Sequence, residues 1–205
     1  MTRLGTQSRH GPGGVLILPQ GRTSGELSSL EPGPRRAARA LRAFGHELPG
    51  LTSPRQILDE CCRVLVRHAG YRMAWVGLAR DDAARTVTPV ASAGVAEGYL
   101  ESVRITWGDD EHGRGPTGTS IRNLVPIVVQ NVLTDPRYEP WRMQAMRRGF
   151  ASSAAIPLMA PHGRCLGAVN VYAEEPNAFD REELELLRRL SLELVTALEA
   201  VGLRD

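Results

Sequence analysis

The stretch WGDDEHGRGPTGTS, residues 107–120, holds the residue types and spacings that could do chemistry. Gly113, Gly115 and Gly118 fall on the G-x-G-x-x-G spacing of a loop that binds nucleotide phosphates. Such a loop follows directly on an apolar strand, whereas here acidic residues precede the first glycine and would repel a pyrophosphate. All 25 basic residues are arginine, so no lysine can contact a phosphate or form a Schiff base. We therefore do not interpret the glycine spacing as a nucleotide site.

The acidic run just before the first glycine offers the ligand types of a metal site. Asp109, Asp110, Glu111 and His112 are contiguous, so they cannot all face one ion without an irregular loop. Neither an EF-hand spacing nor a zinc spacing accompanies them. We interpret the run as a solvated loop and expect no metal site.

The glycines and the proline of this stretch also predict a turn into a helix. Gly115 and Gly118 are expected to allow positive φ and a close approach of backbones. Thr117 or Thr119 is placed to cap a helix that begins near Gly118. The start of a helix carries free N–H groups, which would suit an anion or a carbonyl oxygen if a pocket lies there.

Three cysteines, Cys61, Cys62 and Cys165, are the remaining candidates for chemistry. An odd number with two adjacent members gives neither a disulfide framework nor a zinc spacing, and it fits a reducing cytoplasm. Cys61 and Cys62 fall on the apolar face of a helix predicted to start at Ser53-Pro54, so we expect both in the core.

The N-terminal part of the chain divides into two segments. Residues 1–34 are rich in Gly, Pro, Ser and Thr and predict a disordered leader. Residues 35–50 predict an amphipathic helix whose apolar seam is Ala37, Leu41, Phe44 and Leu48. Its outer face is expected to carry Arg35, Arg36, Arg39 and Arg42. Arginines without interleaved aromatic residues are typical of a solvated face, so a nucleic-acid contact is not expected.

Short apolar runs predict strands at 73–79, 86–93, 126–132, 152–160 and 165–173. The first two form a plausible hairpin, and Pro89 places the second at an edge or at a bulge. Taken with the helices, this order predicts an α+β fold, an antiparallel sheet with helices packed against it.

Two further helices are marked by their first residues. Asp135 and Pro136 predict a cap and a first position for a helix over 136–148. Asp180 and Glu183 form a capping-box-like pair at the start of the last helix. The apolar seam of that helix runs on to the C-terminus as Leu184, Leu187, Ser191, Leu194, Leu198 and Val201.

The order of the elements and several segments resemble a GAF domain, the small-molecule sensor module of bacterial signalling proteins. The matching segments are GYRMAWVGLA, GRGPTGTSIRNLVPIVVQNVLTDPRY and GFASSAAIPLMAPHGRCLGAVNVYAEEPNAFDREELELLRRL, within residues 53–201. The resemblance implies a central antiparallel sheet of about six strands, with a ligand pocket between one face and irregular loop-helix segments. It also implies terminal helices that often dimerise and pass signals onward.

Departures from the family pattern narrow the function. The cyclic-nucleotide branch uses an Asn-Lys-Phe-Asp-Glu set, which a chain without lysine cannot complete. Bilin-binding members attach the pigment through a cysteine often followed by histidine, whereas the cysteines here precede Cys, Arg and Leu. The free methionine-(R)-sulfoxide reductase needs a nucleophilic and a resolving cysteine around the pocket. Because Cys61 and Cys62 are expected on a helix and Cys165 stands alone, that enzyme is kept only as an alternative.

The resemblance also implies which residues would contact a ligand. Aromatic side chains that roof the pocket, Trp107, Tyr138 and Trp141, can bury a flat ligand, and core packing is the other interpretation. The candidate ligand-binding set is Trp107, Asp109, Gly115, Thr117, Gly118, Thr119, Arg137, Trp141 and Ser153. No catalytic residue and no metal are expected, and no cofactor can be named.

The expected function is a non-catalytic, cytoplasmic sensor that binds an unidentified small molecule and signals through its terminal helices to a kinase or cyclase output partner. The seams at 37–48 and 184–201 predict a homodimer. A membrane partner is not expected, because the longest apolar run near the N-terminus is only Val15 to Leu18. A structural dimerisation module with a closed pocket is a further alternative, and the chain is either a stand-alone sensor or a fragment of a larger one.

Overall fold

The computed structural model describes residues 33–95 and 98–202, and the structural statements below concern these residues. The predicted leader lies outside them except for Gly33 and Pro34, which already belong to the first helix. That helix, α1 (Gly33–Glu47), therefore begins before the predicted residue 35, and the short 3-10 turn η2 (Leu48–Gly50) follows it.

The described strands form one antiparallel sheet in the order β2-β1-β5-β4-β3. They are β1 (Met73–Ala79), β2 (Val87–Gly94), β3 (Ile127–Val129), β4 (Ser152–Met159) and β5 (Cys165–Ala173). The sheet has five strands where about six were expected, and an isolated bridge between Thr86 and Thr106 lies beyond it. The prediction for Pro89 is confirmed, because β2 is an edge strand and the register shifts beside that residue.

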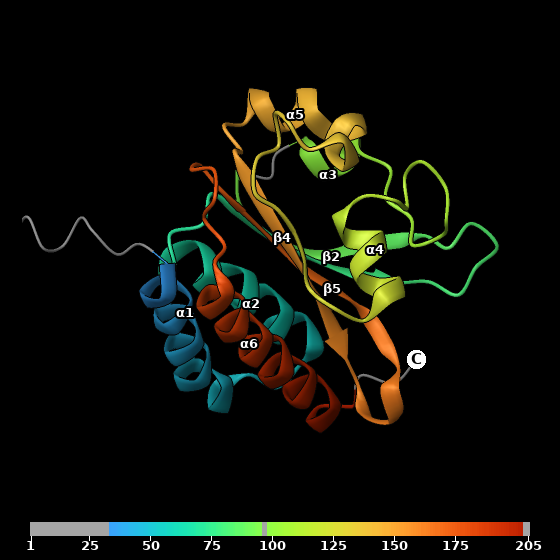
Figure 1. Ribbon diagram of the computed structural model, residues 1–205. Coiled ribbons are helices and arrows are strands. Elements are labelled where there is room, and N and C mark those ends of the chain that lie inside the picture. Colours follow the sequence, from blue (N-terminus) through green and yellow to red (C-terminus); the bar gives the residue numbers. More distant parts are fainter. Residues whose placement is uncertain (1–32, 96–97, 203–205) are drawn as a thin grey trace, which may run out of the picture. The chain divides into compact units, whose positions relative to one another are not determined.

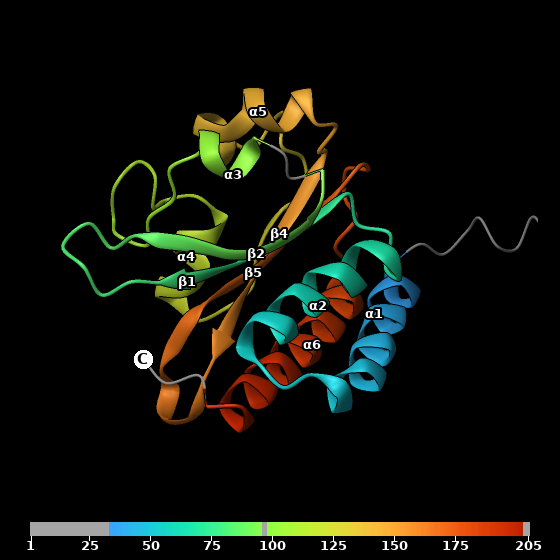
Figure 2. The same ribbon diagram turned by 180° about the vertical axis from the view of Figure 1, so that it is seen from behind.

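Helices cover both faces of the sheet, which confirms the α+β prediction (Figures 1 and 2). One face packs against α2 (Pro54–Arg67) and α6 (Arg181–Ala200), and α1 packs on these two helices. Over the other face lie α3 (Tyr99–Ser102), α4 (Pro116–Asn123), the 3-10 segment η3 (Pro136–Trp141) and α5 (Arg142–Arg147). We call α3, η3 and α5 the roof. None of the helices in the described ranges is long and apolar enough to cross a membrane.

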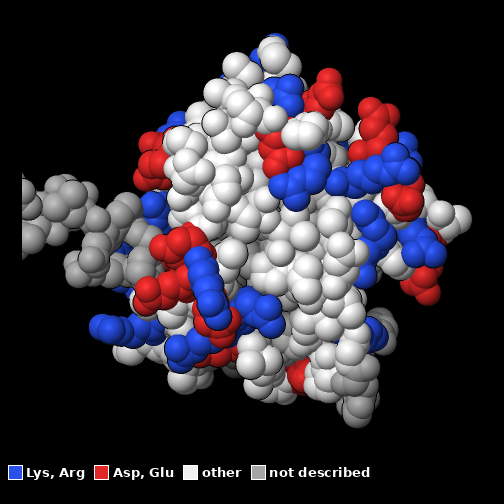
Figure 3. All heavy atoms as spheres, viewed as in Figure 1, with Lys and Arg blue, Asp and Glu red and all other residues white. Residues whose placement is uncertain are grey.

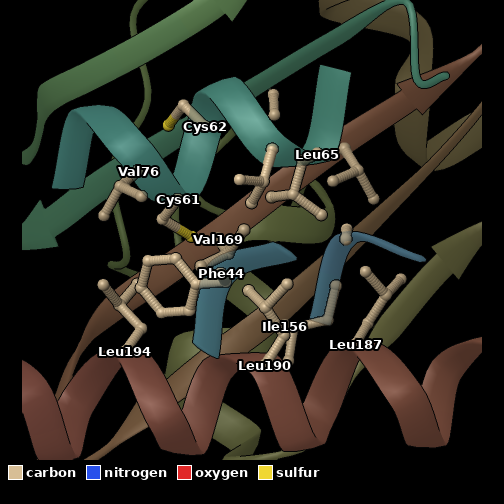
Figure 4. Packing of buried hydrophobic residues seen from close by; sticks show 14 of the residues in the cluster. Phe44, Cys61, Cys62, Leu65, Val76, Ile156, Val169, Leu187, Leu190 and Leu194 are labelled. Atoms are coloured by element: carbon tan, nitrogen blue, oxygen red, sulfur yellow. The ribbon is translucent and has the colours of Figure 1, made fainter. Parts of the chain in front are cut away.

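The helix-side core is built from the predicted seams (Figure 4). Cys61 and Cys62 are completely buried in it, as predicted. Phe44 of α1 and Leu187 and Leu194 of α6 pack there as well. The two seams that predicted a homodimer are therefore used inside the chain, and a dimer through these helices would need their other residues.

Capping residues start three of the helices as predicted. Ser53 accepts a hydrogen bond from the backbone of Gln56 at the start of α2, and Asp135 does the same for Arg137. Asp180 caps α6, but the predicted capping box is wrong in its second half. The Glu183 side chain does not turn back to the cap, because it accepts a hydrogen bond from the Tyr71 hydroxyl.

The prediction that Arg36 lies on the outer face of α1 is also wrong, because Arg36 is buried beside Glu183. Its Nε lies 3.9 Å from Oε1 of Glu183, and its Nη2 lies 3.5 Å from Oε1 of Glu175. Burial raises the pKa of Glu183 to about 7, while the Tyr71 hydroxyl, Arg36 and the backbone N–H of Ala37 oppose that rise. This cluster ties α1 to the start of α6.

Candidate functional site

A second apolar cluster fills the space between the sheet and the roof. Because side chains alternate along a strand, β1 and β5 contribute Trp75 and Tyr172 to this side of the sheet and other residues to the helix side. The remaining aromatic residues come from the roof and from the chain just after it. We call this cluster the chamber and define it by Trp75, Tyr99, Tyr138, Trp141, Phe150 and Tyr172.

Hydroxyl groups meet inside the chamber. The hydroxyl oxygens of Tyr99 and Tyr138 are 3.4 Å apart, and Trp75 donates its indole N–H to the Tyr172 hydroxyl at 3.0 Å. Burial raises the pKa of Tyr99, Tyr138 and Tyr172 above the ordinary tyrosine value. These side chains therefore stay neutral and keep their hydroxyl protons as donors.

Ser153 adds a hydroxyl without a partner. In the sheet it stands opposite Tyr172 of β5 and Val129 of β3. Both neighbours pack in the apolar cluster between the sheet and the roof, so Ser153 faces the roof. The residue is only 3% exposed, and its Oγ has no hydrogen-bond partner. A buried unpaired hydroxyl is unfavourable by about 1–3 kcal/mol, so a ligand group could satisfy it.

Polar groups also join α4 to the sheet beside the chamber. The Thr117 hydroxyl donates to Oδ1 of Asn170 at 2.8 Å, and Asn170 lies opposite Trp75. Ser120 donates to the backbone oxygen of Ala155 at 3.2 Å. These bonds hold the start of α4 over the middle of the sheet.

The chamber is nearly closed. A residual cavity of about 10 Å³ lies between the start of α4 and the roof, with room for roughly one water molecule. Its lining includes Tyr99, His112, Thr117 and Trp141. The Trp141 ring lies so close to Gly115 that a Cβ at that glycine would overlap it.

The glycines of the opening stretch are needed for close approach and not for positive φ. Gly115 has φ −69°, and Gly118 is not among the positive-φ residues, which corrects the prediction for both. A Cβ at Gly118 would overlap the backbone oxygens of Gly113 and Thr106. The helix begins at Pro116 and not near Gly118, and no side chain caps it.

The acidic run folds into a compact loop. Asp110 accepts hydrogen bonds from the Thr106 hydroxyl and from the backbone of His112, at 2.9 and 2.8 Å. Arg122 of α4 donates to the backbone oxygens of Gly108 and Gly113, at 2.6 and 2.7 Å. These contacts stabilise the loop and tie it to α4. The described residues contain no group of three side chains suited to a metal ion.

The predicted ligand-binding residues separate into two sets. Gly115, Thr117, Gly118 and Trp141 line the residual cavity, and Ser153 faces the roof from the sheet. The other four residues make their polar contacts outside the residual cavity. The indole of Trp107 donates to the backbone of Arg80, and the Arg85 guanidinium lies over its ring.

The remaining members of the second set are Asp109, Thr119 and Arg137. Asp109 pairs with Arg114 at 2.9 Å, and the Thr119 hydroxyl donates to the backbone of Arg114. Arg137 pairs with Asp135 and donates to the backbone oxygen of Val128, so its guanidinium is engaged outside the chamber.

The cysteines do not meet at the chamber. Cys61 and Cys62 belong to the helix-side core, across the sheet from it. Cys165 packs at the edge of the chamber cluster, and burial raises the pKa of its thiol. A raised pKa leaves the thiol protonated, whereas nucleophilic cysteines are thiolates.

Sequence reasoning missed Trp75, Tyr99, Asn170 and Tyr172. The last two carried a signal, because Ala168, Asn170 and Tyr172 occupy alternate positions of β5 and so share one face. Polar atoms on one face of an otherwise apolar strand indicate that this face meets something polar. Tyr99 carried no comparable signal, because its position depends on how α3 folds over the sheet.

Comparison with known proteins identifies the fold family. A family model described as GAF domain matches residues 52–199, which is well over half of the chain. The chain belongs to the GAF domain family. No curated protein matches it significantly.

Solved structures of other GAF-like proteins share this fold. The free methionine-R-sulfoxide reductase from Neisseria meningitidis is 21% identical, with coverage of 80% of this chain and 89% of that chain and a TM-score of 0.65. The GAF domain of a phosphoenolpyruvate-protein phosphotransferase from Coxiella burnetii is 18% identical, with coverage of 82% and 95% and a TM-score of 0.67. The A. aeolicus nlh2 GAF domain is 18% identical, with coverage of 80% and 96% and a TM-score of 0.62. At these identities the likeness establishes the fold.

Proposed function

We propose that this GAF domain is a non-catalytic sensor whose chamber binds a small molecule. The observation that carries the proposal is an apolar enclosure in which the Tyr99 and Tyr138 hydroxyls meet and toward which Ser153 turns a buried hydroxyl without a partner. A site of this kind, apolar with a few convergent polar groups, is typical of small-molecule pockets.

A purely structural core would not need these hydroxyl groups. Phenylalanine in place of tyrosine and alanine in place of Ser153 would fill the same space without burying polar atoms. An unsatisfied buried hydroxyl weakens the ligand-free fold, and a ligand that hydrogen-bonds to it recovers that stability. The presence of these hydroxyls therefore supports binding more than packing.

The nearly closed cavity supports a second candidate, a structural module whose pocket is filled by its own side chains. A volume of about 10 Å³ holds no metabolite. The sensor proposal therefore requires the roof to open, so that the ligand selects a less populated open state. The affinity measured for a ligand would be reduced by the fraction of molecules that are open.

The reductase alternative has less support. The fold is shared with a free methionine-R-sulfoxide reductase, but thiol-based reduction needs a reactive thiolate and a second thiol nearby. Cys165 carries a protonated thiol at the edge of the chamber, while Cys61 and Cys62 lie across the sheet. We therefore propose that the site binds without catalysis.

A change in the chamber on ligand binding could reach the helices through the sheet itself. β1 and β5 carry chamber residues on one side and contact the helix-side core on the other, so a displacement of Tyr172 or Trp75 would reach α2 and α6. We propose that α1 and α6 pass this change to an output partner, a kinase or a cyclase, in a homodimer. Light scattering that finds a strict monomer at high concentration would remove the dimer from this account.

Two buried serines provide the test. Ser153→Ala removes the unpartnered chamber hydroxyl, whereas Ser191→Ala removes a hydroxyl that donates to Pro157 in the helix-side core at 2.9 Å. The small-molecule fraction of the host's own cell extract is added, and the melting temperature is followed. A sensor predicts a rise for the wild type and for Ser191→Ala, and little or no rise for Ser153→Ala.

The same two variants also separate binding from folding. Without extract, Ser153→Ala should melt at or above the wild-type temperature, because it removes an unsatisfied group, while Ser191→Ala should melt lower. An extract that stabilises none of the three proteins would support the structural module instead.

A further inference from the structure

We propose that the ligand of the chamber is an uncharged molecule with a flat aromatic ring, and that it takes the place of the Trp141 indole. This inference rests on the proposed sensor function and names the chemical class that the site would accept. It depends on three features of the chamber: its uncharged interior, its aromatic walls and the long hydrogen bond that holds Trp141.

The interior of the chamber offers no charge to pair with an ionic ligand. Its defining residues are neutral, and the other buried polar side chains around it are Thr117, Ser120, Ser153 and Asn170. A cation does lie beside it, because the half-buried guanidinium of Arg148 is 5.2 Å from the centre of the Tyr99 ring and donates to Gln144 at 2.8 Å. Charged side chains on the face drawn in Figure 3 stand in groups around a broad uncharged surface.

An ion that entered such a site would lose its hydration without gaining a counter-charge, which is strongly unfavourable. Hydroxyl and indole N–H groups can instead satisfy an amide, carbonyl or hydroxyl group. His112 at the edge of the residual cavity and Arg148 beside the Tyr99 ring are side chains that could change this rule, because a protonated imidazole or a guanidinium would attract an anion. The experiment below therefore includes two pH values.

The walls of the chamber favour a flat ring. Phe150 packs against Tyr172 with ring centres 4.6 Å apart, and Tyr99 meets both of them edge-on at 5.6 and 5.9 Å. Tyr138 meets Trp141 at 6.0 Å with their planes 64° apart. A ring in the position of the indole would keep the edge-to-face contact with Tyr138.

Trp141 is held more weakly than Trp75, the other tryptophan of the chamber. Its indole N–H donates to the backbone oxygen of Arg104 at 3.4 Å, a long hydrogen bond. The indole of Trp75, on an inner strand, donates to the Tyr172 hydroxyl at 3.0 Å. Trp141 is 5% exposed and lines the residual cavity, while Trp75 is completely buried. Displacing Trp141 would open a space of about the size of an indole beside the Tyr138 ring, continuous with the residual cavity that Tyr99 also lines.

Gly115→Ala tests the displacement. The added Cβ would overlap the indole ring, so the Trp141 side chain must move to another position. The backbone at Gly115 has φ −69° and ψ 176°, which alanine adopts without strain, so the substitution acts through the indole. Gly50→Ala is the matched control, because a Cβ there has open space and Gly50 is not among the positive-φ residues.

The probes are benzamide and benzoate, which have nearly the same shape and differ in charge. Binding to the wild type, Gly115→Ala and Gly50→Ala is measured by ligand-observed NMR titration at pH 6 and pH 8. We expect benzamide to bind the wild type weakly, and benzoate to bind at least about tenfold more weakly still at both pH values. Gly115→Ala should bind benzamide about tenfold more tightly than the wild type or Gly50→Ala, because the site is already open.

Benzoate binding that equals benzamide binding at either pH would overturn the uncharged class. Equal benzamide affinities for Gly115→Ala and the wild type would overturn the displacement of Trp141. If neither probe binds any variant, the aromatic class is wrong. The sensor function is judged separately, because a wild-type melting temperature that still rises with host extract would show that another kind of ligand is bound.

Discussion

Glu183 should make the stability of the domain depend on pH. Its carboxyl is completely buried, and burial raises its pKa from the ordinary value of 4.5 to about 7 in the folded protein. The folded state therefore binds a proton more tightly than the unfolded state. The stabilisation from that proton is fully present below about pH 4.5 and is lost as the pH rises through about 7.

The size of this effect follows from the separation of the two pKa values. A difference of about 2.5 pH units corresponds to at most roughly 3 kcal/mol of unfolding free energy. Glu183→Gln keeps the shape of the side chain and removes the titration. We expect the unfolding free energy of the wild type, relative to this variant, to fall by up to that amount between pH 4.5 and pH 8.

The assay is urea denaturation followed by tryptophan fluorescence at intervals over this pH range. Glu182→Gln is the control, because Glu182 is exposed in the same first turn of α6. Its stability curve should run parallel to that of the wild type. Parallel curves for Glu183→Gln and the wild type would refute the reasoning, since they would mean that Glu183 does not bind a proton differently on folding.

Three further substitutions or reagents test the packing described above. Gly118→Ala should lower the unfolding free energy by about 1–3 kcal/mol in urea denaturation, because its Cβ meets backbone oxygens, whereas Gly50→Ala should change it little. Phe44→Ala should lower it by about 3–5 kcal/mol if α1 is part of the fold, and a loss below 1 kcal/mol would show that α1 detaches. A thiol reagent at pH 7 should label Cys165 slowly and the two helix-side cysteines only after unfolding, as followed by mass spectrometry; rapid labelling of Cys165 would contradict its raised pKa.

Most of the fold could be predicted from the sequence because its signals are local. The strand β1 was predicted with its observed ends, since apolar residues run without interruption between a glycine-containing turn and charged residues. The starts of α2 and α6 followed from Ser53 and Asp180, whose side chains bond within their own helices. Capping and periodicity need no knowledge of distant parts of the chain.

The predictions that were wrong concern contacts between distant residues. Arg36 has the spacing of an exposed residue on α1, yet Glu183, nearly the whole domain away in sequence, draws it inward. Gly115 and Gly118 were expected to allow both positive φ and a close approach of backbones. Positive φ was wrong, the close approach is confirmed at Gly118 against the backbone of Gly113, and the contact of Gly115 with Trp141 was not foreseen. Periodicity does not contain information of this kind.

Only part of the candidate site could be predicted, because its residues also come together from distant parts of the chain. Gly115, Thr117, Gly118, Trp141 and Ser153 were assigned through the order of segments, and they do lie at the chamber. Tyr99 was not, because nothing near it in sequence indicates that its hydroxyl meets that of Tyr138. Convergence of side chains from separate elements became visible only in the folded chain.

The central claim is that the chamber binds a small molecule, and native mass spectrometry tests it most directly. The protein is produced in its own host, purified without denaturation and measured together with Ser153→Ala. The account predicts a wild-type mass above that of the polypeptide, with the excess released on denaturation and reduced or lost in Ser153→Ala. A wild-type mass equal to that of the polypeptide alone, or an excess that Ser153→Ala retains in full, would contradict it.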